Sequence, residues 1–223
     1  MTGATEDGDM SADLGGMIGA AYALETREQT LAHYEAWADT YDREVGEELA
    51  YAQPGRCAAA LAAVARAGGR TPVGRLLDVG CGTGLSGLAF RDAGFADQDG
   101  CDFSPPMLER AAATGVYDRL FEADLNEGLD IEDAAYDHAA AVGLFSFGQV
   151  GSDTLREILR VVRPGGTVVI GLNDHFWDEG GVPAELEAIE ADGLATMAFR
   201  EHGDHLPGAD IGGWVVVMVR ATS

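Results

Sequence analysis

The chain has 223 residues, 47% of them hydrophobic, which is enough for one α/β domain with a substantial core and too few for two complete Rossmann domains. Its formal net charge is -24 at pH 7, and all 14 of its basic residues are arginine. Because nucleic acids and anionic membranes bind clustered Lys and Arg, we expect neither as a partner of so acidic a chain.

The first twenty residues and the cysteines give the expected compartment. Residues 1–20 are acidic and rich in small residues, lack the basic and apolar regions of a signal peptide, and are predicted to form a disordered tail. No apolar run approaches the roughly 20 residues of a membrane span. Cys57, Cys81 and Cys101 follow neither a disulfide framework nor a zinc-binding spacing. We therefore expect a cytoplasmic protein without a metal site.

Two helices are predicted before the first strand. Residues 25–46 have helical periodicity, with Tyr34, Trp37 and Tyr41 on one face, and a second helix is predicted over 55–67. Aromatic side chains at this spacing can form part of a core or cover a ligand site.

The chain is expected to have three parts. After the tail, residues 21–72 are predicted to form a helical lid, and residues 73–223 are predicted to form the core that binds the cofactor. The oligomeric state is left open between monomer and homodimer.

From residue 75 onward, short apolar runs alternate with helical stretches. Strands are predicted over 75–79, 97–102, 117–125, 136–145, 167–173, 196–201 and 213–220. Helices are predicted over 85–92, from Ser104 as N-cap, over 152–162 with "RPGG" closing it, and over 183–193. The last two strands have no helix between them and must be antiparallel. The pattern predicts an α/β fold, a doubly wound, Rossmann-like, seven-stranded sheet with helices on both faces and a C-terminal antiparallel strand pair.

The stretch "LLDVGCGTGLSG" can be interpreted as either of two cofactor loops. Gly82, Gly84 and Gly87 give the G-x-G-x-x-G of a dinucleotide site, whereas Gly80 together with the first two gives the G-x-G-x-G of a methyl-donor site. An aspartate at the strand end, Asp78, would repel a pyrophosphate but attract a sulfonium and an ammonium group. The aspartate therefore favours S-adenosylmethionine.

The ends of the next strands carry further candidate ligand contacts, because ligands of such sheets lie at the carboxyl ends of the strands. Asp102 can accept hydrogen bonds from ribose hydroxyls with either cofactor. Asp124 suits the exocyclic amine of adenine, and the N–H of Leu125 suits the adenine ring.

Four segments in order resemble the class I S-adenosylmethionine-dependent methyltransferases: "LLDVGCGTG", "GCDFSPPMLERA", "EADL" and "LRVVRPGG", which span about residues 75–171. Upstream, "HYEAWADTYDREVGEELAYAQPGRCAAAL" is similar to the lead-in of the Williams-Beuren-region methyltransferase-like proteins. The resemblance implies the fold, S-adenosylmethionine as cofactor, and no single acceptor.

The resemblance also implies roles for individual residues. The amino-acid end of the donor, the ribose, the adenine, the adenine amine, the sulfonium side and the lid are expected, in that order, at Asp78, Gly80, Cys81, Gly82 and Gly84; Asp102; Phe103 and Met107; Asp124 and Leu125; Gly143 and Leu144; and Tyr41. "AVGLFSFGQV" departs from the N-P-P-Y tetrad of enzymes that methylate amino groups of nucleic acids and glutamine, which puts those acceptors in doubt.

The expected function is methyl transfer from S-adenosylmethionine to a small-molecule acceptor. Tyr41 is expected to close over the methyl group, and His175, after the fifth strand, is a candidate general base. His202 and His205 lack a third ligand and are interpreted as part of a solvated loop. The alternatives are an NAD(P)-dependent oxidoreductase and a non-catalytic methyltransferase-like binding module.

Overall fold

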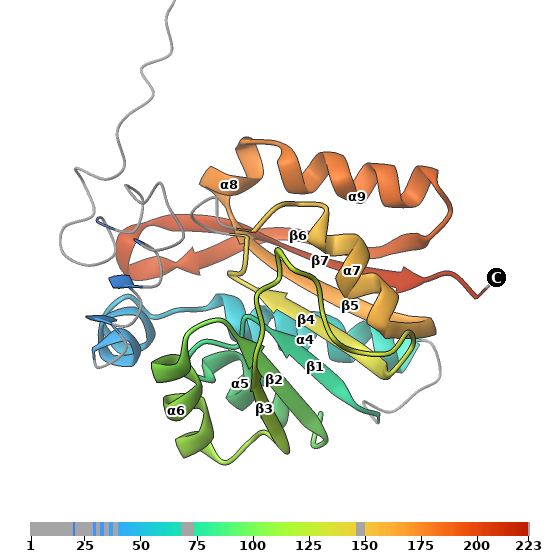
Figure 1. Cartoon of the computed structure of the whole chain (residues 1–223). Coiled ribbons are helices and arrows are strands. Elements are labelled where there is room, and N and C mark those ends of the chain that lie inside the picture. The colour runs from blue at the N-terminus through green and yellow to red at the C-terminus, as the bar shows by residue number, and fades with distance from the viewer. Residues whose placement is uncertain are drawn as a thin grey trace, which may run out of the picture.

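Seven strands form one sheet in the computed structural model, which describes residues 20, 29, 32, 33, 36, 37, 40–67, 74–145 and 150–222 (Figure 1). The elements in chain order are η1 Asp42–Glu48, α4 Gln53–Ala67, β1 Leu76–Val79, α5 Leu85–Ala93, β2 Gln98–Asp102, α6 Pro105–Thr114, β3 Arg119–Glu122, β4 Tyr136–Val142, α7 Thr154–Val161, β5 Val162–Asn173, α8 Asp174–Asp178, α9 Gly181–Ala191, β6 Ala195–Leu206, η2 Pro207–Ala209 and β7 Ile211–Arg220.

The strand order is β3-β2-β1-β4-β5-β7-β6. The first five strands pair in parallel, and β7 runs antiparallel to both β5 and β6. The predicted doubly wound sheet with its C-terminal antiparallel pair is confirmed. The order reverses between β1 and β4, the point at which a ligand is expected to bind at the carboxyl ends of the strands.

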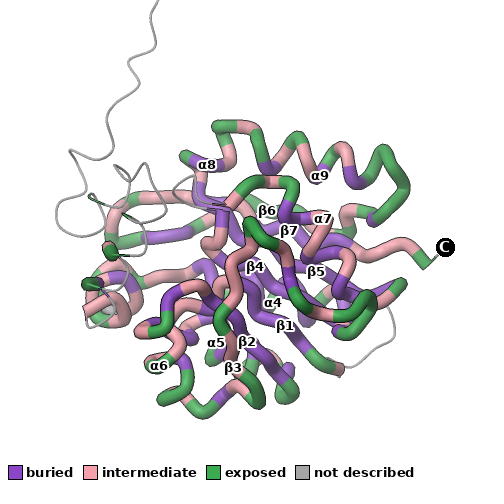
Figure 2. Tube along the Cα trace, in the orientation of Figure 1, coloured by how far each residue is buried: buried purple, intermediate pink, exposed green. Residues whose placement is uncertain are grey.

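Both faces of the sheet are covered, as expected from strands that are apolar on both sides. On one face, Leu77 and Ile170 pack with apolar side chains of α7, α8 and α9. On the other, Leu76 and Val169 pack with α4 and α5. The central strands are consequently buried along their length (Figure 2). Among the described residues, no helix is both long and apolar enough to cross a membrane.

Three predicted boundaries in the C-terminal half are wrong. "RPGG" does not separate a helix from a strand, because β5 already begins at Val162 and passes through a register shift before it pairs evenly from Thr167. Residues 174–178 form a helix, α8, that was not predicted. β6 continues to Leu206, because its polar second half pairs with the glycine-rich start of β7.

The predicted lid at 21–72 does not move as one piece in this fold. Its second helix, α4, packs on the sheet and contributes Cys57 and Leu61 to the core, so it belongs with the sheet. The described residues of the first helix are helical as far as Tyr41, where the π-helix η1 follows in place of a continuous α-helix. Tyr34 and the tail, residues 1–19, lie outside the described residues.

Candidate active site

A cavity opens at the carboxyl ends of the strands, below the N-terminal segment. Its wall includes most of the residues expected to bind the cofactor, namely Tyr41, Gly80, Cys81, Gly82, Asp102, Phe103, Met107, Asp124, Leu125, Gly143 and Leu144. Asp78, Gly84 and His175 do not line it. Sequence segments that are far apart, from residue 37 to residue 206, therefore meet around one space.

The glycine turn after β1 forms one end of the cavity. Gly80, Gly82 and Gly84 have φ angles of +69°, +52° and +97°, which favour glycine. A Cβ on Gly82 would meet no atom within 4 Å, whereas one on Gly80 would lie 2.6 Å from the Cδ1 atom of Leu144. Gly82 therefore leaves open the space that a ligand could approach closely.

The Asp102 carboxylate is fixed beside this turn at the end of β2. Its Oδ2 accepts a hydrogen bond from the Gly82 N–H at 2.9 Å, and its Oδ1 accepts one from the Ser104 N–H at 3.0 Å. Burial raises the pKa of Asp102, and the backbone hydrogen bonds oppose that rise. The carboxylate is thereby held in one orientation at the cavity wall, with lone pairs left for ligand hydroxyl groups.

Asp78 lies beneath the turn and not in the cavity. Its Oδ2 accepts hydrogen bonds from the hydroxyls of Ser86 at 2.6 Å and Tyr117 at 2.7 Å, while its Oδ1 is buried without a hydrogen-bond partner. Burial raises the pKa of Asp78 to about 6. In this position the carboxylate supports the turn from below and has no direct path to a ligand.

Packing also explains the remaining glycines of the stretch. A Cβ on Gly87 would lie 2.3 Å from the Tyr117 hydroxyl oxygen, so this glycine makes room for the tyrosine that reaches Asp78. Gly84 is the N-cap of α5, and a Cβ there would lie 3.3 Å from the Ala111 backbone. The third glycine of the dinucleotide pattern therefore serves the packing of a tyrosine.

The N-terminal segment is held against the glycine turn. The Thr83 hydroxyl donates a hydrogen bond of 2.5 Å to Oδ1 of Asp42, at the start of η1. Tyr41 lines the cavity and packs edge-on against Trp37, whose indole N–H donates to Glu44 at 2.8 Å. Burial, and the nearby carboxylates of Asp42 and Asp102, raise the pKa of Tyr41, so its hydroxyl stays protonated.

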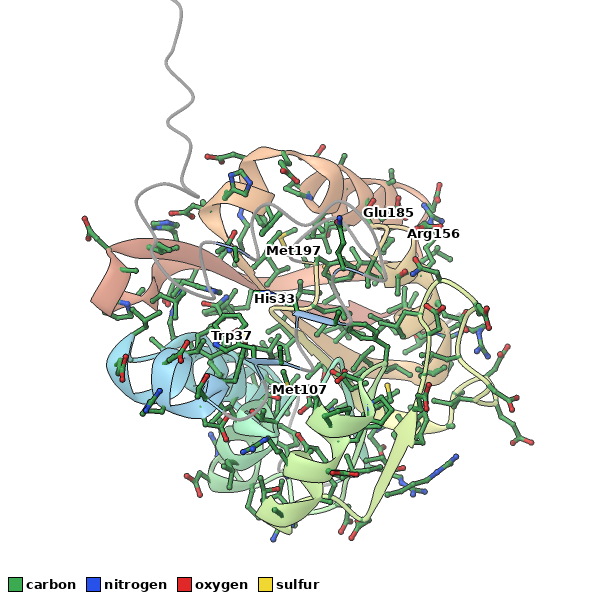
Figure 3. All side chains as sticks on the ribbon, turned by 60° about the vertical axis from the view of Figure 1, so that its left-hand side comes forward. His33, Trp37, Met107, Arg156, Glu185 and Met197 are labelled. Atoms are coloured by element: carbon green, nitrogen blue, oxygen red, sulfur yellow. The ribbon has the colours of Figure 1, made fainter. Side chains whose placement is uncertain are left out.

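Trp37 and Met107 lie on the same side of the molecule in Figure 3, and both line the cavity. The cavity is thus bounded by the N-terminal segment on one side and by α6 on the other.

A second part of the wall lies over β4, β5 and β6. Tyr51 packs its hydroxyl against Gly143, where a Cβ would lie 2.7 Å from the oxygen. Asn173, at the end of β5, caps α8 by accepting a hydrogen bond from the Phe176 N–H. His205 and Leu206 complete this wall from the end of β6.

The interpretation of His202 and His205 as parts of a solvated loop is wrong, because both lie on β6. His202 is on the outside and bonds to Asp174 through Nε2 at 2.9 Å. His205 is only 6% exposed and faces the cavity. Sequence reasoning missed His205, Tyr51 and Asn173. The pair of glycines at 212 and 213, opposite the polar end of β6, was the available signal for a close approach there.

His175 lies on α8, away from the cavity. Its imidazole stacks edge-on against Phe176 and faces Glu179, with 3.4 Å between Nε2 and Oε1. The geometry gives it no contact with a substrate at the strand ends. Within the described part of the chain, no three His, Cys, Asp or Glu side chains are grouped as a metal site.

The charge of the cavity wall is compatible with a cationic ligand. Its described residues include two carboxylates, Asp102 and Asp124, and no arginine. A pyrophosphate would meet carboxylates without a counter-charge, whereas a sulfonium and an ammonium group would be attracted. The open space at Gly82 and the apolar surfaces of Phe103, Met107 and Leu125 suit the amino-acid and adenine ends of S-adenosylmethionine.

Comparisons with known proteins agree with this geometry. Residues 77–170 match the model of the "Methyltransferase domain" family. Human Methyltransferase-like protein 27 is 34% identical over 195 residues, which are 86% of this chain and 78% of that protein. The 27-O-demethylrifamycin SV methyltransferase of Amycolatopsis mediterranei is 27% identical over 194 residues, or 78% of this chain and 70% of that protein.

Among solved structures, a chain of the complex between the Haloferax volcanii Trm112 methyltransferase activator and a methyltransferase superposes with a TM-score of 0.62. It is 22% identical, and the match covers 84% of this chain and 97% of that one. This likeness shows the same fold.

Proposed function

The chain belongs to the class I S-adenosylmethionine-dependent methyltransferases, of the type of human Methyltransferase-like protein 27, and on this premise we propose that it methylates a small-molecule acceptor in the cavity described above. Its cofactor is S-adenosylmethionine. The observation that carries the proposal is the wall of the cavity, which joins a carboxylate-lined glycine turn to an adjoining uncharged surface.

We propose that the donor binds over β1, β2 and β3. Gly80, Cys81 and Gly82 would hold its amino-acid end, and Asp102 its ribose hydroxyls. Phe103 and Met107 would pack on the adenine, with Asp124 and Leu125 at its edge. Gly143 and Leu144, after β4, would lie beside the sulfonium. Asp78 and Gly84 then support the turn from behind it.

When bound, S-adenosylmethionine supplies a methyl group already activated by a sulfonium leaving group. The protein therefore needs chiefly to align the two reactants and to exclude water. Tyr41 and Trp37, held over the cavity by the Thr83–Asp42 bond, are positioned to exclude water. Leu144 packs on Gly80 and so brings the ends of β1 and β4 together, between donor and acceptor.

A small-molecule acceptor is favoured by the enclosure of the site. The wall over β4, β5 and β6 is made mainly of apolar side chains, and it lies under the N-terminal segment. One relative is named for methylating a small compound, 27-O-demethylrifamycin SV. The identity of the acceptor atom is left open between oxygen, nitrogen and sulfur.

The two alternatives predict different ligands or no turnover. An NAD(P)-dependent oxidoreductase would place a pyrophosphate beside Asp102, which the charge of the wall disfavours. A thermal-shift comparison of S-adenosylhomocysteine with NADH would separate the two cofactors. A binding module would take up the donor without turnover, so a labelled-methyl assay against a metabolite library would separate it from an enzyme.

The direct test of the donor site is calorimetry with S-adenosylhomocysteine on the wild type, Asp102→Ala and Glu122→Ala. Loss of hydrogen bonds to a charged group should weaken binding to Asp102→Ala by about 1.5 to 3 kcal/mol. Glu122 pairs with Asp102 across β2 and β3 but is exposed and does not line the cavity, so its variant should bind normally. Equal affinities for all three proteins would contradict the assignment of Asp102.

A further inference from the structure

Six residues remain in the wall once the proposed donor contacts and the N-terminal segment are set aside from the cavity over β4, β5 and β6: Tyr51, Val142, Leu172, Asn173, His205 and Leu206. The group contains no carboxylate and no arginine. Its polar side chains are a phenol, an amide and an imidazole. This part of the wall, the acceptor wall, differs from the donor contacts in carrying no permanent charge.

His205 enters the acceptor wall through an irregularity in β6. Asp204 pairs with Gly212 and Leu206 pairs with Ile211, and the register shifts between them, so His205 sits in a β-bulge. Bulges redirect a side chain and are common beside active sites. Here the bulge places the imidazole in the cavity wall although the strand lies at the edge of the sheet.

The bulge is fixed by bonds to the rest of the fold. The Ala52 N–H donates to the His205 carbonyl at 3.0 Å, and the Arg56 guanidinium donates to the carbonyls of Asp204 and Gly213. Gly213 gives the ring its room, because a Cβ there would lie 3.1 Å from His205 Nδ1. The ring also packs edge-on against Tyr51, with 5.2 Å between centroids.

The imidazole is buried without being satisfied. Its Nδ1 has no hydrogen-bond partner, and such a buried polar atom costs about 1 to 3 kcal/mol. Burial and the positive charge of Arg56 lower the pKa of His205 to about 4, against a smaller opposite effect of Asp174. The ring is therefore uncharged near neutral pH, and it presents a neutral hydrogen-bonding edge in an apolar wall.

We infer that His205 is the hydrogen-bonding contact for the methyl acceptor, and that this acceptor is an uncharged molecule with a largely apolar body and a hydroxyl or similar neutral polar group. The inference rests on the proposed function. A carboxylate or an ammonium group in this wall would be buried without a counter-charge among the described residues, which is costly. A neutral hydroxyl group can instead bond to the imidazole and leave the apolar body against Leu172 and Leu206.

The test uses the full chain saturated with S-adenosylhomocysteine and three ring compounds of similar size: phenol, benzoate and benzylamine. Binding is measured by ligand-observed NMR at pH 7. We expect phenol to bind at least tenfold more tightly than benzoate or benzylamine. His205→Ala and His205→Phe should each weaken phenol binding at least tenfold, and the second variant keeps a ring of similar size if the first folds poorly.

His202→Ala is the matched control, because His202 lies on the same strand but on its outer side, bonded to Asp174. It should bind phenol as the wild type does. No phenol binding to the saturated wild type, tighter binding of a charged compound, or normal phenol binding by His205→Phe would overturn the inference.

The same samples separate this inference from the proposed function. S-adenosylhomocysteine should bind the wild type and both His205 variants with affinities within twofold of one another. Failure of the wild type to bind it would overturn the proposed function. Normal binding of it, combined with a preference for benzoate or benzylamine, would overturn only the assignment of the acceptor class.

Discussion

The donor contacts and the acceptor wall are two parts of one cavity that are built differently. The donor contacts come from the glycine turn and the ends of β2 and β3, and they include two carboxylates. The acceptor wall comes from residues as far apart as Tyr51 and Leu206, and it carries no permanent charge. Backbone conformation and short motifs define the first part, whereas long-range strand pairing and packing define the second.

This difference teaches how one fold can keep its cofactor while its acceptor varies. Gly82 and Asp102 are joined by a bond from backbone to side chain, so the donor contacts depend on a few adjacent residues. His205 depends instead on a bulge, on Arg56 and on the segment before α4. Changes in these distant segments can reshape the acceptor wall without disturbing the glycine turn.

The charge beneath the donor contacts can be removed by Asp78→Asn, and this gives the largest expected effect. Because burial raises the pKa of Asp78 from 3.8 to about 6, the folded protein retains a proton that the unfolded chain has lost. The free energy of unfolding should therefore fall as the pH rises from about 4 to about 6. Asp78→Asn removes that loss, which is roughly 3 kcal/mol for a shift of this size.

Denaturant unfolding of the wild type and Asp78→Asn at pH 4, 5, 6 and 7 measures the effect. The variant should gain stability relative to the wild type as the pH rises through this window. Parallel pH profiles would show that Asp78 is ionised in the folded protein at pH 4, and that the turn is not built on a strained carboxylate.

The cover over both parts can be opened by Tyr41→Ala. If Tyr41 closes over the donor, this variant should weaken S-adenosylhomocysteine binding about tenfold, or about 1.4 kcal/mol. It should lower kcat/KM by at least as much once an acceptor is known. Tyr41→Phe, which keeps the ring against Trp37, should stay within twofold.

The competing role of Tyr41 is core packing. In that case Tyr41→Ala would lower the melting temperature by many degrees while the folded fraction bound the ligand normally. Calorimetry and thermal unfolding on the same sample therefore decide between a cover and a core residue.

The bond between the glycine turn and the N-terminal segment can be cut by Thr83→Val, with the smallest expected effect. Valine has nearly the same shape but cannot donate to Asp42. Amide exchange in residues 42–48 should become about fivefold faster, which is close to the 1 kcal/mol of a typical hydrogen bond.

Thr114→Val is the control for that measurement. The Thr114 hydroxyl donates within α6, to the Ala111 carbonyl at 2.6 Å, so its loss should leave exchange in residues 42–48 unchanged. Equal exchange in wild type and Thr83→Val would show that packing of Trp37 and Val45 alone holds the segment.

The two parts also differed in how far the sequence predicted them. The strands and turns that carry the donor contacts were predicted within one or two residues in most cases, because glycines and apolar runs mark them locally. The placement of Asp78 under the turn was not predictable, since it depends on Tyr117 and Ser86 reaching the same carboxylate oxygen.

The end of β6 shows why the acceptor wall was missed. Its residues "EHGDHL" have low strand propensity, and only pairing with β7 and the bonds from Arg56 make them a strand. Nothing local in the sequence says that His205 is turned inward while His202 is turned outward. Antiparallel register and the bulge decide this, and both are properties of the assembled sheet.

The central claim is that the open space at Gly82 is where the donor binds, and calorimetry of S-adenosylhomocysteine with Gly82→Asn and Gly115→Asn tests it most directly. Both glycines have positive φ angles, +52° and +66°, and neither would meet an atom within 4 Å if it carried a Cβ. Asparagine tolerates this backbone conformation better than most residues do. Only Gly82 lines the cavity.

We predict that the wild type and Gly115→Asn bind one equivalent of S-adenosylhomocysteine with the same affinity. Gly82→Asn should bind at least tenfold more weakly, with a melting temperature close to that of Gly115→Asn. No heat of binding by the wild type at millimolar ligand, or equal binding by all three proteins, would contradict the account.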